Sequence, residues 1–111
     1  MRVKLSDKQR LFTGLVSDLI RHAYEQGYAL TWGAAFRDPA WGVGHKTSLH
    51  GLRLAVDLNL FVRVDGVWIY KTATEDHRPL GEWWEARHEL CRWGGRFQDG
   101  NHYSLEHEGM R

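Results

Sequence analysis

The sequence has little cysteine and proline, and it has no long apolar run. Cys91 is the only cysteine, so neither an internal disulfide nor a Cys-x-x-Cys zinc knuckle is possible, and we expect its thiol to be buried as a small apolar group. No stretch reaches the roughly 18 apolar residues of a membrane span, and residues 1–7 lack the apolar segment of a secretory signal. We therefore expect no membrane span, and a chain that stays in the cytoplasm where it is made unless another agent releases it.

Charge of one sign is also missing, because the formal net charge is +1 and no basic run occurs. This argues against the basic surface by which many proteins bind nucleic acid, so we expect no nucleic-acid partner. A chain of 111 residues suffices for one modest core, which predicts a single domain over residues 1–111; we also expect a monomer. Six Trp and seven His are present, and with one cysteine any metal site must consist of His and carboxylate ligands.

Two helices are expected from the spacing of apolar residues. The first covers residues 6–26, with Ser6 as its N-cap and Gly27 just after its end. The second begins at Pro79 and stops at the Gly94-Gly95 pair. Their apolar faces recur at helical spacing. These faces consist of Phe12, Leu15, Val16, Leu19, Ile20, Ala23 and Tyr24 in the first helix, and of Leu80, Trp83, Trp84, Leu90 and Cys91 in the second.

Four stretches are predicted to be strands. The first covers residues 28–35, and the central one covers residues 53–63. Asp65-Gly66 is typical of a tight hairpin turn, so residues 67–70 should return antiparallel to the central strand. A last short strand is expected over residues 103–108. This order of elements predicts an α+β fold with a small, mostly antiparallel sheet flanked by helices.

The central strand carries a carboxylate among apolar residues. Leu54, Val56, Leu58 and Leu60 alternate with Arg53, Ala55, Asp57 and Asn59, so the two sets point to opposite faces. A carboxylate on a strand that belongs to the core is costly unless something pairs with it. His50 lies just before the strand, and a bound metal ion would explain both His50 and Asp57.

Two motifs resemble the zinc signature of the M15 peptidases. The first motif, S-x-H-x(6)-D, consists of Ser48, His50 and Asp57. The second motif, D-x-x-H followed by an aromatic residue, contains Asp99 and His102. The family contains D-alanyl-D-alanine carboxypeptidases and dipeptidases, and L-alanyl-D-glutamate endopeptidases of phage lysis cassettes. The resemblance extends over most of the chain and implies the M15 peptidase fold, which Hedgehog signalling domains resemble.

The resemblance implies a catalytic zinc site with His50, Asp57 and His102 as ligands. Two imidazoles and one carboxylate suit Zn²⁺, and three protein ligands leave a fourth position for water. Strand alternation agrees, because Asp57 projects from the polar face of its strand and His102 heads a strand that can lie beside it. The alternative is that Asp57 is a salt-bridged acid and His102 a hydrogen-bonded histidine, with no metal.

Further roles follow from the same resemblance. Asp99 matches the acid that serves as general base, although Asp99-Gly100 is also a typical turn. Arg37 matches an arginine that stabilises the oxyanion or anchors the substrate carboxylate, the alternative being a surface arginine. Ser48 is expected to contact the substrate or to donate a hydrogen bond to a metal ligand. Arg53 stands where many members have Gly, and we expect it to reach over the cleft and affect specificity.

The remaining histidines are predicted to lie outside the metal site. His45 should border the cleft, and His107 should face away from the metal. His22, His77 and His88 are expected at the surface.

The resemblance to the M15 family thus implies a zinc metallopeptidase that cuts an amide in the stem peptides of bacterial peptidoglycan. L-Ala–D-Glu endopeptidase activity is the first expectation and D-Ala–D-Ala carboxypeptidase the second. A phage or prophage endolysin would remain in the host bacterial cytoplasm until released to the cell wall, and no separate wall-binding domain is expected. The alternative from another class is a zinc-stabilised wall-binding module without turnover.

Overall fold

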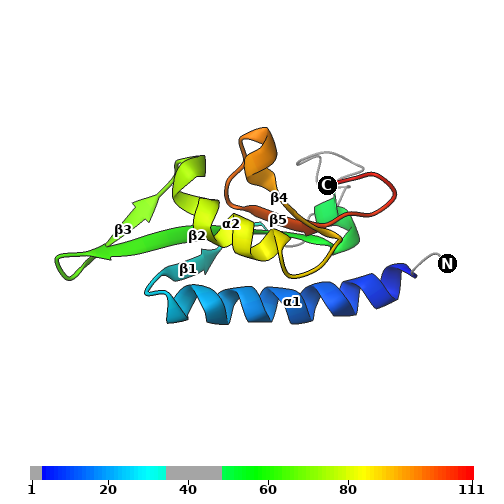
Figure 1. Ribbon diagram of the computed structural model, residues 1–111, viewed down its shortest axis with the longest axis horizontal. Coiled ribbons are helices and arrows are strands. Elements are labelled where there is room, and N and C mark those ends of the chain that lie inside the picture. The colour runs from blue at the N-terminus through cyan, green and yellow to red at the C-terminus, as the bar shows by residue number, and fades with distance from the viewer. Residues whose placement is uncertain (1–3, 35–48) are drawn as a thin grey trace.

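The computed structural model describes residues 4–34 and 49–111. This part of the chain forms a small single-domain α+β fold, as predicted, with two α-helices and an antiparallel sheet of five strands where four were expected (Figure 1). In chain order the elements are α1 (Leu5–Glu25), β1 (Ala29–Trp32), η2 (Leu49–Leu52), β2 (Ala55–Val64), β3 (Val67–Lys71), η3 (Thr74–His77), α2 (Arg78–Glu85), β4 (Cys91–Trp93), η4 (Gly94–Phe97) and β5 (His102–Leu105), where η denotes a 3₁₀ turn.

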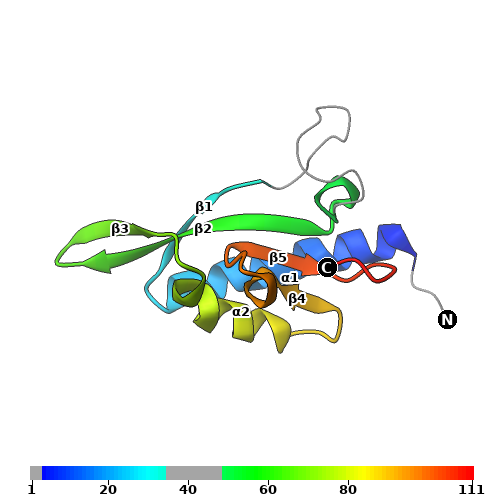
Figure 2. The same cartoon turned by 90° about the horizontal axis from the view of Figure 1, so that it is seen from above.

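The long strand β2 organises the sheet, whose order is β1-β2-β5-β4 with β3 also paired to β2. Residues 58–61 of β2 pair with β1 on one edge. On the other edge residues 55–57 pair with β5 and residues 60–64 with β3, so β5 and β3 follow one another along β2. A gap therefore lies between the end of β3 and the start of β5. Beyond the body of the molecule β2 and β3 continue as a projecting hairpin (Figure 2).

The core lies between α1, α2 and the inner face of the sheet. The predicted stripe of α1 is confirmed, with Phe12, Leu15, Val16, Leu19 and Ala23 buried. Trp84 of α2 is fully buried at the centre, with its ring at right angles to those of Phe12 and Tyr103. Its indole N–H donates to the carbonyl oxygens of Arg92 and Ser104, at 3.1 and 3.2 Å. The one polar atom of this large apolar side chain is thereby satisfied.

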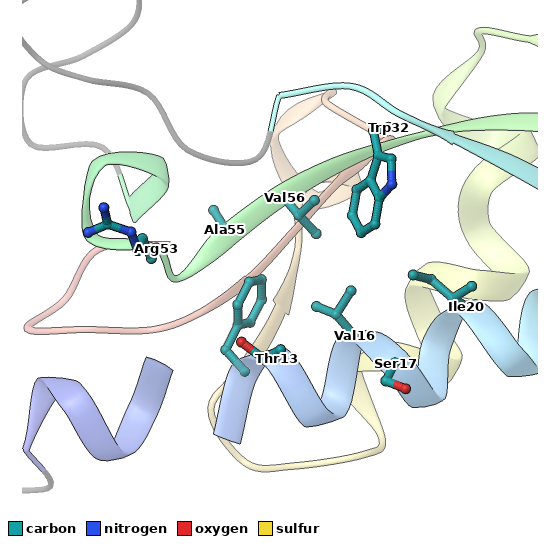
Figure 3. A pocket seen from close by; sticks show the side chains of 9 residues that line it. Thr13, Val16, Ser17, Ile20, Trp32, Arg53, Ala55 and Val56 are labelled. Atoms are coloured by element: carbon teal, nitrogen blue, oxygen red, sulfur yellow. The ribbon is translucent and has the colours of Figure 1, made fainter. Parts of the chain in front are cut away.

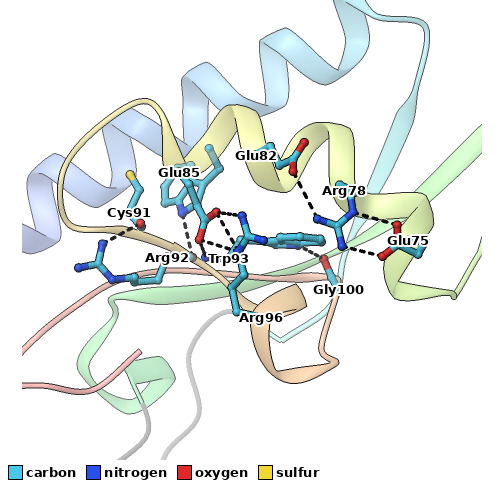
Figure 4. Close-up of polar contacts among 10 residues, drawn as sticks. Glu75, Arg78, Glu82, Glu85, Cys91, Arg92, Trp93, Arg96 and Gly100 are labelled. Carbon is cyan, nitrogen blue, oxygen red and sulfur yellow. Dashed lines mark hydrogen bonds and ion pairs between the residues drawn. The ribbon is translucent and has the colours of Figure 1, made fainter.

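The predicted length of the second helix is wrong. α2 ends at Glu85, and the chain turns back so that Cys91–Trp93 forms β4 beside β5. The indole of Trp93 is buried, and its N–H donates to the Gly100 carbonyl oxygen at 2.7 Å (Figure 4). Cys91, which would continue the helical stripe, is instead buried in β4, because tertiary contacts override a local periodicity.

Several boundaries also differ from prediction. α1 begins at Leu5 after Lys4, so Ser6 lies inside the helix and is not the N-cap. Gly27 follows the helix end with φ of 90°, as a C′ glycine should. Asp65 and Gly66 both have positive φ, which confirms the hairpin turn. Within the described ranges, no helix has the length and apolar character required to cross a bilayer.

The contact between α2 and Trp93 gives a test of the fold. A methyl group at Gly81 would overlap the indole ring of Trp93, which its hydrogen bond holds in place. We expect Gly81→Ala to lower the free energy of unfolding by about 1–3 kcal/mol. Gly14→Ala on the open side of α1 meets nothing within 4 Å and should instead raise it by up to about 1 kcal/mol. Urea denaturation of both variants measures these changes. A Gly81→Ala protein with the same free energy of unfolding as the wild type would contradict the packing of Gly81 against Trp93.

Candidate metal centre

Asp57 and His102 meet because they are direct cross-strand partners in β2 and β5. Partners in an antiparallel pair project from the same face of the sheet. His50 comes from η2, which leads into β2 and is closed by a hydrogen bond from the Leu54 N–H to the Leu49 carbonyl oxygen at 2.9 Å. All three side chains are buried, as few acids and histidines are.

His50, Asp57 and His102 form a compact group, called here the His–Asp–His group. Asp57 Oδ1 lies 3.3 Å from His50 Nε2 and 3.3 Å from His102 Nδ1. The three candidate ligand atoms all lie within 4.8 Å of one another. Ligand atoms at tetrahedral positions around an ion with bonds of 2.0–2.1 Å lie roughly 3.3–3.4 Å apart, so two of the three separations already suit coordination.

The electrostatics of Asp57 favour the ionised form. Burial raises the pKa of this carboxyl group, but the hydrogen bonds from His102 and His50 outweigh burial and hold the pKa well below its usual range. Asp57 therefore presents a carboxylate to two imidazoles. Such a convergence of two nitrogens and one anionic oxygen can hold a metal ion.

Backbone contacts from other segments hold the ligands in position. The Gly33 N–H donates to the Asp57 carbonyl oxygen at 2.8 Å, and the Asp57 N–H donates to the Ala34 carbonyl oxygen. A Cβ at Gly94 would overlap the Asp99 carbonyl oxygen and lie 2.6 Å from His102 Cβ. Gly94 was predicted only to end a helix, and its role in this close approach could not be seen without the path of the chain.

Asp99 lies beside the His–Asp–His group. Its Oδ2 atom is 4.0 Å from His102 Nδ1, and half of its side chain is exposed. The Asp99 N–H donates to the Gly94 carbonyl oxygen, and the Asp99 carbonyl oxygen accepts from the His102 N–H. Asp99 is therefore part of a turn, and this turn directs its carboxylate to the edge of the group.

The structure does not place every predicted residue at this site. Arg37, Ser48 and His45 lie outside the described residues. Arg53 adopts a left-handed conformation, with φ of 58°, and lines a pocket of about 510 Å³ between α1 and the start of β2 (Figure 3). Trp32 borders the same pocket and pairs with Leu58, so its side chain lies on the face opposite Asp57. This pocket is thus separate from the His–Asp–His group.

The prediction for His77 is wrong, because this side chain is 2% exposed. Burial lowers its pKa below the usual value and so favours the neutral ring, although a hydrogen bond to the Lys71 backbone acts in the opposite direction. Its ring packs against Gly100, where a Cβ would lie 3.1 Å from His77 Cδ2. His77 therefore supports the turn that carries Asp99.

The remaining histidines make contacts of their own. His22 is half-buried and stacks on Trp83 with 4.0 Å between ring centroids. His88 Nδ1 accepts from the Leu90 N–H at 3.1 Å. His107 Nδ1 lies 3.1 Å from Lys8 Nζ, after the end of β5. Cys91 is buried as expected, and burial raises the pKa of its thiol to about 12.

Comparison with known proteins gives no family: no family model matches the sequence, and no curated protein matches it. The structure thus defines an α+β domain with a buried His–Asp–His group that can hold a metal ion. Membership of the M15 family stays a prediction from the two motifs.

Metal binding by this group is directly testable. We expect the purified protein to hold about one metal ion per chain and the His50→Ala/Asp57→Ala double variant to hold none. Metal at 100 times its dissociation constant stabilises the folded state by about 2.7 kcal/mol, which raises Tm by on the order of 10 °C in a domain of this size. Elemental analysis and thermal melting with and without a chelator measure both effects.

His22→Ala is the matched control, because His22 lies on α1 and is not part of the His–Asp–His group. It should keep its metal content and its response to the chelator. Full occupancy in the double variant would remove the His–Asp–His group from metal binding.

Proposed function

We propose that the protein is a zinc-dependent peptidase that hydrolyses an amide bond in peptidoglycan stem peptides, as a phage or prophage endolysin does. L-Ala–D-Glu is the favoured bond. The proposal depends chiefly on one observation: a half-exposed carboxylate, Asp99, lies 4.0 Å from a buried group of two imidazoles and a carboxylate. This is the set of groups that hydrolysis of an amide by a metal-activated water requires.

Zinc is the metal proposed for the His–Asp–His group. Two nitrogens and one oxygen form a borderline-soft ligand set, and the 3.3 Å separations from Asp57 Oδ1 match the edges of a small tetrahedral site. When bound, zinc supplies a Lewis acid that lowers the pKa of water to about 7. The side chains of the protein then have to orient the substrate and move the protons.

Asp99 is the residue proposed to move these protons. Its carboxylate accepts a proton from the attacking water and returns it to the nitrogen of the departing amine. Its exposure allows a substrate to reach it, whereas Asp57 is buried and held by both histidines. The two acids thus have separate tasks set by their surroundings. Arg37 and Ser48 are proposed from the resemblance alone to bind the carbonyl oxygen and the substrate.

One departure from the family pattern also supports the resemblance. Arg53 stands where many M15 members have Gly, and it adopts φ of 58°. This region is open to glycine without steric cost and is disfavoured for a residue with a Cβ. The backbone at this position therefore has the conformation that a family glycine would adopt most easily.

Purified peptidoglycan provides the decisive substrate. The zinc-loaded protein should release fragments with new L-Ala carboxyl and D-Glu amino termini, and a chelator should abolish their release. Mass spectrometry identifies the termini, and loss of only a terminal D-Ala would indicate the carboxypeptidase instead. His50→Ala serves as the control for contaminating hydrolases. No cleavage of any wall substrate by the zinc-loaded protein, despite tight binding, would favour a non-catalytic wall-binding module.

Asp99→Asn separates catalysis from metal binding. The substitution keeps the shape of the side chain but removes its capacity to accept the proton. We expect zinc content and fold to be unchanged and turnover to fall by roughly 10²–10⁴-fold. Asp18→Asn is the matched control, because Asp18 lies on α1 in an exposed pair with Arg87. Equal turnover by Asp99→Asn and the wild type at matched zinc content would exclude Asp99 as the base.

A further inference from the structure

A polar pocket of about 140 Å³ adjoins the His–Asp–His group, and neither motif predicted it. It lies where β3 ends and β5 begins, and it is bordered by η3 and by the turn that carries Asp99. We call it the Asn59–Asn101 pocket. Its lining includes Asn59, Thr72, Thr74, Gln98, Asp99 and Asn101. Such a volume has room for several waters or for a short polar segment of a ligand.

Three of the lining residues connect this pocket to the His–Asp–His group. Asn59 follows Asp57 by two residues on β2 and so projects from the same face of the sheet. Asn101 immediately precedes His102. Asp99 borders both the pocket and His102. A substrate whose departing amine receives a proton from Asp99 would therefore direct its departing segment into this pocket.

The chemistry of the lining fits peptide amides. Asn101 Nδ2 donates to Asn59 Oδ1 at 3.3 Å, and in the part of the chain that the structure describes the Asn59 amide nitrogen has no hydrogen-bond acceptor. Within the described ranges the side chains of Thr72, Thr74 and Gln98 form no hydrogen bond. Side-chain amides and hydroxyls both donate and accept. A peptide segment, with one N–H and one C=O per residue, matches such a set.

A carboxylate fits the pocket less well. Asp99 contributes a negative charge, and of the lining residues that the structure describes Lys71 is the only cationic one. Lys71 is the cross-strand partner of Leu60, so its side chain leaves β3 on the face opposite Asn59 and Asp57.

One wall of the pocket is closely packed. A Cβ added at Gly100 would lie 2.7 Å from Thr74 Cα, so η3 and the turn that carries Asp99 are in tight contact.

We propose that the Asn59–Asn101 pocket binds the peptide segment that follows the scissile amide and recognises it through hydrogen bonds to its amide groups. The proposal rests on the peptidase function proposed above. It adds a subsite on the departing side and makes the length of the departing segment a determinant of the rate.

Two synthetic substrates test the subsite. The short one is acetyl-L-Ala-D-Glu with its γ-carboxyl capped as a carboxamide, and the long one continues from the γ-carboxyl through L-Lys-D-Ala. We expect kcat/KM for the long substrate to be roughly tenfold higher or more, the effect of one or two net hydrogen bonds. Equal values for the two substrates would overturn the proposal.

Substitutions in the lining test whether the higher kcat/KM for the long substrate arises from the pocket. Thr74→Val preserves the shape of the side chain and removes its hydroxyl, and Asn59→Ala removes an amide. Each should lower kcat/KM for the long substrate by roughly 3–10-fold and leave the short substrate nearly unchanged. Thr13→Val on α1 is the matched control and should change neither value, because Thr13 borders the other pocket. Equal losses on both substrates, at matched zinc content, would also overturn the subsite.

A binding measurement separates this proposal from the peptidase function. The tripeptide D-Glu-γ-L-Lys-D-Ala, the product of the long substrate, is titrated into the zinc-loaded protein while the side-chain amide signals of Asn59, Gln98 and Asn101 are followed by NMR. Shifts confined to these signals, even if neither substrate is cleaved, support a peptide site while the peptidase function fails. Absence of shifts at millimolar peptide overturns the pocket, whether or not the substrates are cleaved.

Discussion

An ionised carboxylate buried between two imidazoles is the constraint on which this structure depends. Removing Asp57 from water costs several kcal/mol unless opposite charge or hydrogen bonds compensate. Compensation requires β5 to pair with β2 in one register, η2 to bring His50 back to the start of β2, and Gly94 to allow the chain to approach His102. A shift of one residue in the β2–β5 pairing would place His102 on the opposite face and leave Asp57 without one partner.

The two faces of β2 have different roles in the domain. One face, with Val56, Leu58 and Leu60, completes the core over α1 and α2. The other presents Asp57 and Asn59 to the ligands from η2 and β5 and to the Asn59–Asn101 pocket. Residues 55–58 are buried on both faces, whereas antiparallel strands commonly expose one face to solvent. The pocket beside Arg53 lies between α1 and β2, and none of its described lining residues belongs to the His–Asp–His group.

Helical periodicity and local turn chemistry allowed much of the fold to be predicted. The stripe of α1 and the Asp65-Gly66 turn depend on neighbouring residues only, and both are confirmed. β4 was missed because Trp93 is buried by a partner strand and by Gly81, which no local pattern reveals. The resemblance to the M15 motifs implied the His–Asp–His group, whereas the buried state of His77 and the adjoining pocket depend on how the chain packs between η3 and η4. The roles of Arg37 and Ser48 stay predictions.

The projecting hairpin gives the molecule a part whose stability is nearly independent of its centre. Val64, Val67, Trp68, Ile69 and Tyr70 are all at least 40% exposed, so this end of β2 and β3 has few buried contacts. Backbone amides there should exchange with solvent deuterium through local opening. The amides of Asp57 and His102 should exchange only when the whole domain unfolds. The exchange rates of the hairpin amides therefore provide an internal reference. A metal ion bound between β2 and β5 should slow amide exchange at the centre and leave the rates in the hairpin unchanged.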